Sequence, residues 1–253
     1  MPRLKSLAGF RMLRIYVRNW MTALFVYLGL ISTAEIKFRD GDSCGISKTN
    51  YATFYEHLYR KYNESNGFHY VDSEAISPNG IKLQLPGLPY SHVLDEVFIM
   101  KCYGEPNLKN RVAVDIGASI GDTSLFFNSL GAEVYAFEPD KHRFRIALEN
   151  VTNNGANENI HVMNQYANSK LIFDLIATKS LKNIFMKIDC EGCELEIIND
   201  LPDNSFQSIA EIVLESHDNN SSKIIERLNA LGFKTRKSHE IISAIRNCNE
   251  KHI

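Results

Sequence analysis

A short apolar run that ends in a glycine turn, near the middle of the chain, is the feature that most constrains the fold. Residues 112–122 are V-A-V-D-I-G-A-S-I-G-D. The apolar run predicts a buried strand, and Gly117 and Gly121 predict a tight turn that opens a helix, because glycine accepts positive φ and permits close backbone approach. A strand that passes through such a turn into a helix is typical of βαβ units. The sequence therefore predicts an α/β domain.

The rest of the second half repeats this alternation of strand and helix patterns. Short apolar runs bounded by turn signals predict seven strands, at 111–116, 133–138, 161–164, 184–189, 210–215 and near Phe233 and Ala244. We expect one doubly wound, mostly parallel seven-stranded sheet. It would occupy residues 105–253, and residues 1–104 would form an N-terminal amphipathic helix and a helical and hairpin cap.

The N-terminal segment is basic and then apolar. Residues 1–34 contain five basic residues and no acidic one, and the apolar run Trp20 to Ile31 is shorter than the roughly 20 residues of a membrane span. Apolar side chains recur at helical spacing over residues 11–31, with arginines on another side. This pattern predicts a helix packed on its own domain. Contact with a membrane interface and a cleaved signal peptide are the alternatives.

Composition excludes some function classes. A net charge of −2 and a pI near 6.5 give no basic excess for binding nucleic acid. Five scattered cysteines, an odd number, favour a reducing compartment, so we expect a cytoplasmic protein. Cys190 and Cys193 form a C-x-x-C sequence, but no second pair or histidine cluster stands at zinc-site spacing. We therefore expect neither metal nor redox use of this pair.

Acidic residues at the ends of two predicted strands indicate a ligand site. Asp115 could anchor a cationic amine or order the glycine turn, and Glu138, followed by Pro139, could accept both hydroxyls of a ribose. A dinucleotide fingerprint needs a second glycine where this chain has Ser119. A cofactor without a pyrophosphate needs none there, which favours S-adenosyl-L-methionine. The alternative is a flavodoxin-like or dehydrogenase-like sheet with another ligand.

A second acidic cluster follows the predicted strand 184–189. Asp189, Glu191 and Glu194 lie within six residues, beside Lys187. Such a cluster can raise one carboxyl pKa toward neutrality, as a general base for a hydroxyl requires. For Glu194 the alternative is support of the next helix through its dipole. On the following strand, Glu215 and His217 would bring another acid and an imidazole to the same edge of the sheet.

These motifs resemble those of the FkbM family of methyltransferases over about Asp95 to the C-terminus. D-I-G-A-S-I-G-D at 115–122, A-F-E-P at 136–139, K-I-D-C-E-G-C-E at 187–194 and E-S-H at 215–217 are similar to the family's four motifs in order. Asn150 matches an asparagine that commonly ends the helix after the second strand, whereas Ser119 replaces the usual asparagine of the glycine turn.

The resemblance implies a class I, Rossmann-like methyltransferase that uses S-adenosyl-L-methionine. It implies O-methylation of a hydroxyl or a carboxylate on a sugar, a glycan or another small molecule. Methylation of nitrogen or protein and a non-catalytic nucleotide-binding module are the alternatives. The expected catalytic residues are Asp189, Glu191 and His217. The expected cofactor-binding residues are Asp115, Gly117, Ala118, Gly121, Glu138 and Pro139. No metal is expected; a magnesium ion on Asp189, Glu191 and Glu215 is the alternative.

Overall fold

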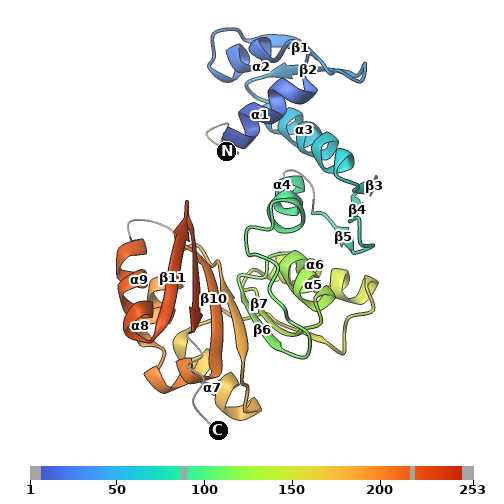
Figure 1. Ribbon diagram of the computed structural model, residues 1–253. Coiled ribbons are helices and arrows are strands. Elements are labelled where there is room, and N and C mark those ends of the chain that lie inside the picture. The colour runs from blue at the N-terminus through green and yellow to red at the C-terminus, as the bar shows by residue number, and fades with distance from the viewer. Residues whose placement is uncertain (1–6, 87–89, 217–219, 247–253) are drawn as a thin grey trace. The chain divides into compact units, whose positions relative to one another are not determined.

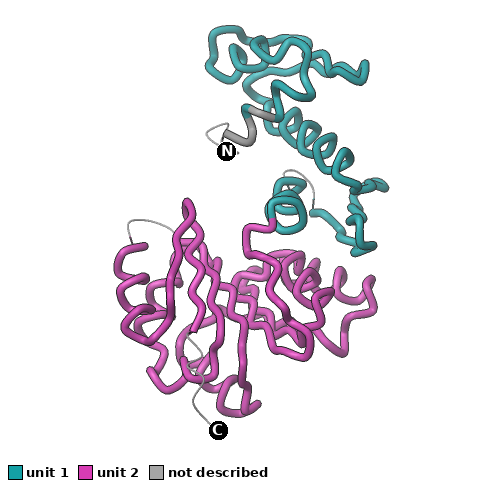
Figure 2. The backbone as a smooth tube through the Cα atoms, in the orientation of Figure 1, with its two compact units in different colours: residues 1–100 teal, residues 101–253 magenta. Residues whose placement is uncertain are grey.

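The chain divides into two compact units, residues 1–100 and 101–253 (Figure 2). The computed structural model describes residues 7–86, 90–216 and 220–246. Each unit has its own secondary structure and its own buried apolar side chains.

A seven-stranded sheet forms the centre of unit 2, in the order β11-β12-β10-β9-β6-β7-β8. Strands β8, β7, β6, β9 and β10 run parallel to one another, whereas β12 is antiparallel to both β10 and β11. The predicted mostly parallel sheet is thus confirmed. Its strands are β6 (Val112–Ile116), β7 (Glu133–Phe137), β8 (Ile160–Met163), β9 (Ile184–Ile188), β10 (Ile209–Glu215), β11 (Phe233–Ser238) and β12 (Ile241–Arg246).

Helices cover both faces of this sheet. In Figure 1, α5 and α6 lie on the opposite side of the sheet from α8 and α9. Buried side chains of α7, α8 and α9 share one apolar cluster with the strands. All five residues of β9 are buried, as expected for a strand covered on both faces. The helices are α5 (Asp122–Ser129), α6 (Lys141–Asn153), α7 (Ser169–Lys179), α8 (Glu194–Asp200), the 3₁₀ helix η2 (Asp203–Ser208) and α9 (Ser221–Ala230).

Unit 1 combines short helices with two small antiparallel sheets. A turn at 39–42 joins β1 to β2 in a hairpin, and β3, β4 and β5 form a second sheet. Its elements are α1 (Leu7–Tyr16), α2 (Trp20–Tyr27), β1 (Thr33–Lys37), β2 (Ser43–Ser47), α3 (Tyr51–Ser65), β3 (His69–Val71), β4 (Glu74–Ile76), β5 (Lys82–Gln84), α4 (Ser91–Leu94) and the π-helical turn η1 (Asp95–Ile99). Buried side chains of α1, α2, the β1–β2 hairpin and α3 form its apolar core.

The single helix predicted over residues 11–31 is wrong, because α1 and α2 are separate helices. Between them Val17 pairs with Phe38 as an isolated bridge. The Asn19 side chain accepts from the Lys37 N–H and donates to the Glu35 carbonyl, both at 2.8 Å. These bonds to β1 replace helical ones, which the apolar spacing alone could not reveal.

In residues 7–86, 90–216 and 220–246, no helix is long and apolar enough to cross a bilayer.

Candidate active site

The carboxyl ends of three neighbouring strands bring the predicted site residues of unit 2 together. Strand β6 lies between β7 and β9, and Ile116 pairs with Phe137 on one side and with Ile188 on the other. The next residues along the three strands are Gly117, Glu138 and Asp189. They therefore meet at one edge of the sheet, where open α/β sheets bind ligands.

Gly117 contacts the chain's own backbone. Its φ is +79°, and a Cβ at this position would lie 1.8 Å from the Asp189 carbonyl oxygen. The N–H groups of Gly117 and Ala118 both donate to the Phe137 carbonyl at 3.0 Å, and the Asp189 N–H donates to the Ile116 carbonyl at 3.0 Å. The glycine turn is thus joined to the ends of both neighbouring strands. The close approach predicted for Gly117 is an approach to Asp189.

The second glycine of the turn faces helix α6. Gly121 has a φ of +82°, and a Cβ there would lie 3.4 Å from the Cα of Ala147. Asn150, which is fully buried in α6, donates from Nδ2 to the Ile120 carbonyl at 2.9 Å. Ser119 also has positive φ, +49°, a conformation that asparagine adopts more readily than serine. The serine therefore keeps the backbone path at some conformational cost.

Glu138 binds the glycine turn from the end of β7. The side chain is 2% exposed. Its Oε2 accepts from the Ser119 N–H at 2.9 Å, its Oε1 accepts from the Asp140 N–H at 2.8 Å, and Arg143 Nε lies 3.5 Å from Oε1. Pro139 contributes its carbonyl oxygen to a bond from Asn164 Nδ2. Each carboxylate oxygen can accept more than one hydrogen bond, so Glu138 keeps acceptor capacity for a ligand that enters beside the turn.

Asp115 is inside the fold and orders the turn. It is fully buried, and its Oδ2 accepts from the hydroxyls of Thr123 and Ser124 at 2.8 and 2.7 Å. Its Oδ1 lies 3.1 Å from Lys187 Nζ, which also donates to the Gly117 carbonyl at 2.7 Å. Of the two roles considered for Asp115, these contacts favour ordering of the turn.

Lys187 is a buried cation that links β9 to the turn. Its side chain is 2% exposed, and its Nζ lies 3.9 Å from Asp189 Oδ2. Burial alone would lower the pKa of Lys187, but the carboxylates of Asp115, Asp189 and Asp122 outweigh it and the pKa is raised. The ammonium is therefore charged at neutral pH and compensates buried carboxylates.

Asp122 provides a pH-dependent prediction. It begins α5, and burial raises its pKa from 3.8 to about 7, opposed by Lys187 and assisted by Asp115. The folded protein thus holds this proton more tightly than the unfolded chain does. Its contribution to stability is complete below pH 3.8 and is lost as the pH rises through about 7.

Asp122→Asn stays neutral and should remove this pH dependence. We expect the difference in free energy of unfolding, variant minus wild type, to increase between pH 4 and pH 8, as measured by urea unfolding at a series of pH values. A difference that stays constant across this range would show that the carboxyl of Asp122 ionises alike in the folded and unfolded chains.

The three acids of the turn after β9 differ in their surroundings. The side chain of Asp189 is 23% exposed, and its Oδ2 accepts from the Tyr103 hydroxyl at 2.7 Å. Glu191 is exposed, with a left-handed φ of +57°. Glu194 is buried, and its Oε1 accepts from the N–H groups of Cys190 and Gly192 at 3.1 and 3.3 Å. Glu194 thus holds the turn together, which leaves Asp189 and Glu191 nearer to solvent.

Tyr103 is a site residue that the sequence did not indicate. Burial, followed by the nearby charge of Asp189, raises its pKa, so the phenol stays protonated and donates to that carboxylate. Its ring also lies 5.3 Å from Lys187 Nζ. No motif contains Tyr103, and it precedes Asp189 by 86 residues, so no local pattern could have linked them.

The Cys190–Cys193 pair is a disulfide in the structure, a bond that the sequence interpretation did not include. That interpretation placed the cysteines in a reducing compartment and gave this pair no redox use. In the structure the two residues are bonded, with their Cα atoms 5.6 Å apart. Positive φ at Glu191 and Gly192 turns the chain back and brings the cysteines together. The bond closes the turn that carries Glu191. Cys44 is a free thiol.

Two side chains were predicted to lie at this edge from the next strand, β10, and the structure describes only one of them. Glu215 ends β10 beside β9 and is half-buried, and His217 lies outside the described residues. No three side chains of histidine, cysteine, aspartate or glutamate within 7–86, 90–216 and 220–246 are grouped as a metal ion requires. The described geometry therefore gives no support to the magnesium alternative on Asp189, Glu191 and Glu215.

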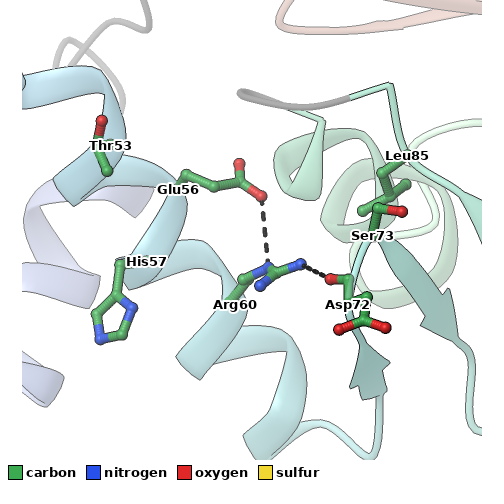
Figure 3. Close-up of a pocket in the computed structure, with 7 residues that line it drawn as sticks. All are labelled: Thr53, Glu56, His57, Arg60, Asp72, Ser73 and Leu85. Atoms are coloured by element: carbon green, nitrogen blue, oxygen red, sulfur yellow. Dashed lines mark hydrogen bonds and ion pairs between the residues drawn. The ribbon is translucent and has the colours of Figure 1, made fainter.

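Unit 1 contains a separate cavity of about 330 Å³ (Figure 3), at the small end of the range of small-molecule sites. Arg60 Nη2 donates to the Asp72 carbonyl at 2.8 Å, its Nε lies 3.8 Å from Glu56 Oε1, and its guanidinium lies over the Tyr70 ring. Burial lowers the pKa of His57, so the imidazole is neutral at pH 7. The lining combines charged, polar and apolar side chains. It consists of Thr53, Glu56, His57, Arg60, Asp72, Ser73 and Leu85.

No protein-family model matches the chain, so membership of the FkbM family stays a prediction. No curated protein matches its sequence.

Similar solved structures include three methyltransferases or cofactor complexes. Precorrin-6y C5,15-methyltransferase from Geobacter metallireducens is 21% identical over 55% of this chain and 81% of its own, with a TM-score of 0.42. Magnesium protoporphyrin IX methyltransferase from Synechocystis PCC 6803, with bound SAM, is 16% identical over 62% and 79%, with a TM-score of 0.44. M. capricolum TrmK, in complex with S-adenosyl-homocysteine, is 18% identical over 58% and 67%, with a TM-score of 0.42. Similarity at this level identifies neither the family nor the activity of this chain.

Proposed function

We propose that this protein is a methyltransferase that uses S-adenosyl-L-methionine and methylates a hydroxyl group. One observation carries the proposal: Glu138 and Asp189 flank the glycine turn on the two strands that neighbour β6. A carboxylate beside the turn suits a ribose, and a second carboxylate nearer to solvent suits the acceptor. The glycine turn, Glu138 and Asp189 each lie in one of the four motifs that resemble those of the FkbM family.

The residues present fit the cofactor. Glu138 is held by two backbone N–H groups and retains acceptor capacity for ribose hydroxyls. The ring of hydrogen bonds around Gly117 and Ala118 fixes the turn before any ligand arrives, so little ordering cost remains at binding. When bound, S-adenosyl-L-methionine supplies an electrophilic methyl group.

Asp189 is the proposed base. Its Oδ2 accepts from the Tyr103 hydroxyl, and Oδ1 is the oxygen that would take the proton from the acceptor hydroxyl, whose oxygen would receive the methyl group in place of the sulfur of S-adenosyl-L-methionine. The ammonium of Lys187 lies 3.9 Å from Asp189 Oδ2 and helps to position this carboxylate. Glu191 and His217 are proposed to assist on the acceptor side. Orientation would supply most of the rate enhancement, with a base adding roughly 10²–10⁴-fold.

A sugar hydroxyl is the proposed acceptor. The resemblance of the four motifs to those of the FkbM family supports this choice, by analogy between families. Transfer of a labelled methyl group to a panel of glycans, phenols, amines and peptides tests this choice. Labelling of amines or peptides alone would instead support the nitrogen-directed or protein-directed alternative.

Cofactor binding tests the core of the proposal. We expect the wild-type chain to bind S-adenosyl-L-methionine and S-adenosyl-homocysteine in calorimetric titrations, and Glu138→Ala to bind them at least tenfold more weakly, because hydrogen bonds to a charged group contribute roughly 1.5–3 kcal/mol. Thermal unfolding of the variant, measured in parallel, shows whether it is folded at the titration temperature.

Glu133→Gln is the matched control for Glu138→Ala. Glu133 begins the same strand and is exposed, so its substitution should leave cofactor affinity unchanged. A wild-type chain that binds neither compound would contradict the proposed function. Equal affinity of a folded Glu138→Ala variant would contradict only the placement of the ribose.

A further inference from the structure

Exposed apolar side chains gather on α1, α2 and the turn that follows them. Seven of the twelve large apolar side chains that are exposed in the described chain lie between residues 10 and 31, with exposed fractions of 36–68%. Single exposed apolar residues are normal, but a contiguous group marks an interaction surface. We name this group the N-terminal apolar face; it consists of Phe10, Ile15, Met21, Phe25, Leu28, Leu30 and Ile31.

The N-terminal apolar face differs from the side of α1 and α2 that packs in the core of unit 1. The same helices bury a different set of side chains, among them Leu13, Val17 and Val26, in the unit's own apolar cluster. Helix α2, W-M-T-A-L-F-V-Y, contains no charged residue, so both of its sides are apolar. A helix that is apolar all round is usually buried in a large core or in lipid. On this second side of α2 and just after it, Met21, Phe25 and Leu28 are 43–59% exposed.

The charge around this face is positive. Residues 1–34 carry five basic residues and no acidic one. Arg14 and Arg18 are exposed, and the Arg14 guanidinium lies 5.8 Å from the centre of the half-buried Trp20 ring. An apolar face with arginines and a tryptophan beside it is complementary to a lipid surface that carries negative phosphates.

We propose that the N-terminal apolar face docks onto an anionic phospholipid surface. The apolar side chains would enter the interface, and Arg14 and Arg18 would contact lipid phosphates. Helix α1 has 10 residues and α2 has 8, so neither can span a bilayer; both would lie in the plane of the interface. The proposal is independent of the cofactor and of methyl transfer.

Vesicle binding tests the proposal with the full chain. We expect co-sedimentation with vesicles of phosphatidylcholine and phosphatidylglycerol, and much weaker binding to phosphatidylcholine alone or at high salt. The triple variant Phe25→Ser, Leu28→Ser, Leu30→Ser should bind at least tenfold more weakly. The double variant Arg14→Gln, Arg18→Gln should lose affinity for the anionic vesicles by roughly tenfold or more, since each basic residue near such a surface contributes about 1 kcal/mol.

A second triple variant is the matched control. Val71→Ser, Leu148→Ser, Ile245→Ser removes three exposed apolar side chains from other elements and should bind vesicles as the wild type does. Absence of binding to anionic vesicles would overturn the proposal, as would an equal loss in both triple variants. A dimer in sedimentation equilibrium that dissociates in the first triple variant, without vesicle binding, would assign the face to a second copy of the chain instead.

Discussion

Gly117→Ala is expected to destabilise the protein by about 2–5 kcal/mol and to abolish binding of S-adenosyl-L-methionine. Two costs combine. A left-handed φ costs a non-glycine residue roughly 1–2 kcal/mol, and a Cβ 1.8 Å from the Asp189 carbonyl must displace backbone, an overpacking cost of typically 1–3 kcal/mol or more. Urea unfolding measures the stability, and calorimetry measures the binding. The displaced segment carries the proposed base, so the site cannot keep its geometry.

Gly155→Ala separates the two costs. Gly155 also has a left-handed φ, +64°, but a Cβ there would meet nothing within 4 Å. Only the conformational cost remains, so we expect a loss of about 1 kcal/mol and unchanged cofactor affinity. If the two variants lost the same stability, the contact between Gly117 and Asp189 would have no energetic role.

Lys187→Met should destabilise the fold by about 3–5 kcal/mol, because it leaves the buried carboxylate of Asp115 without its cation. Adding Asp115→Asn removes that charge and should restore part of the loss, with a coupling energy of roughly 0.5–3 kcal/mol in the double-mutant cycle. Urea unfolding of the wild type, both single variants and the double variant measures the coupling.

Lys182→Met is the matched control, since Lys182 is exposed and its substitution should change stability by less than about 0.5 kcal/mol. Strictly additive effects of Lys187→Met and Asp115→Asn would show that the buried pair contributes through packing alone.

The sheet was predictable because each of its strands has a local signal. Apolar runs such as 112–116 and 184–188 end at turn residues, and the observed strands begin and end within about two residues of the predicted ones. The N-terminal helices were not predictable in the same way. Whether the backbone continues as a helix past Val17 depends on bonds between Asn19 and β1, and these are tertiary contacts.

The same distinction between local sequence signals and tertiary contacts applies to the candidate site. The edge positions of Gly117, Glu138 and Asp189 follow from strand ends in a parallel sheet, which the sequence marks directly. The part played by each carboxylate does not. Asp115 is internal and Glu194 binds backbone N–H groups, whereas Asp189 receives a hydroxyl from Tyr103. These differences depend on which side chains other segments supply, and a motif does not encode them.

The contact between Gly117 and Asp189 also has a consequence for how the chain reaches its native state. These two residues are 72 positions apart, and β7 and β8 lie between β6 and β9 in the sequence although β9 is a direct neighbour of β6 in the sheet. Contacts of such long sequence separation are slow to form and depend on completed topology. On a nascent chain that ends before β9, the glycine turn therefore lacks its contact with the segment that contains Asp189. A ligand that requires both neighbouring strands binds only the complete sheet and stabilises it by mass action. Cofactor concentration would therefore influence how much of the newly made protein is folded.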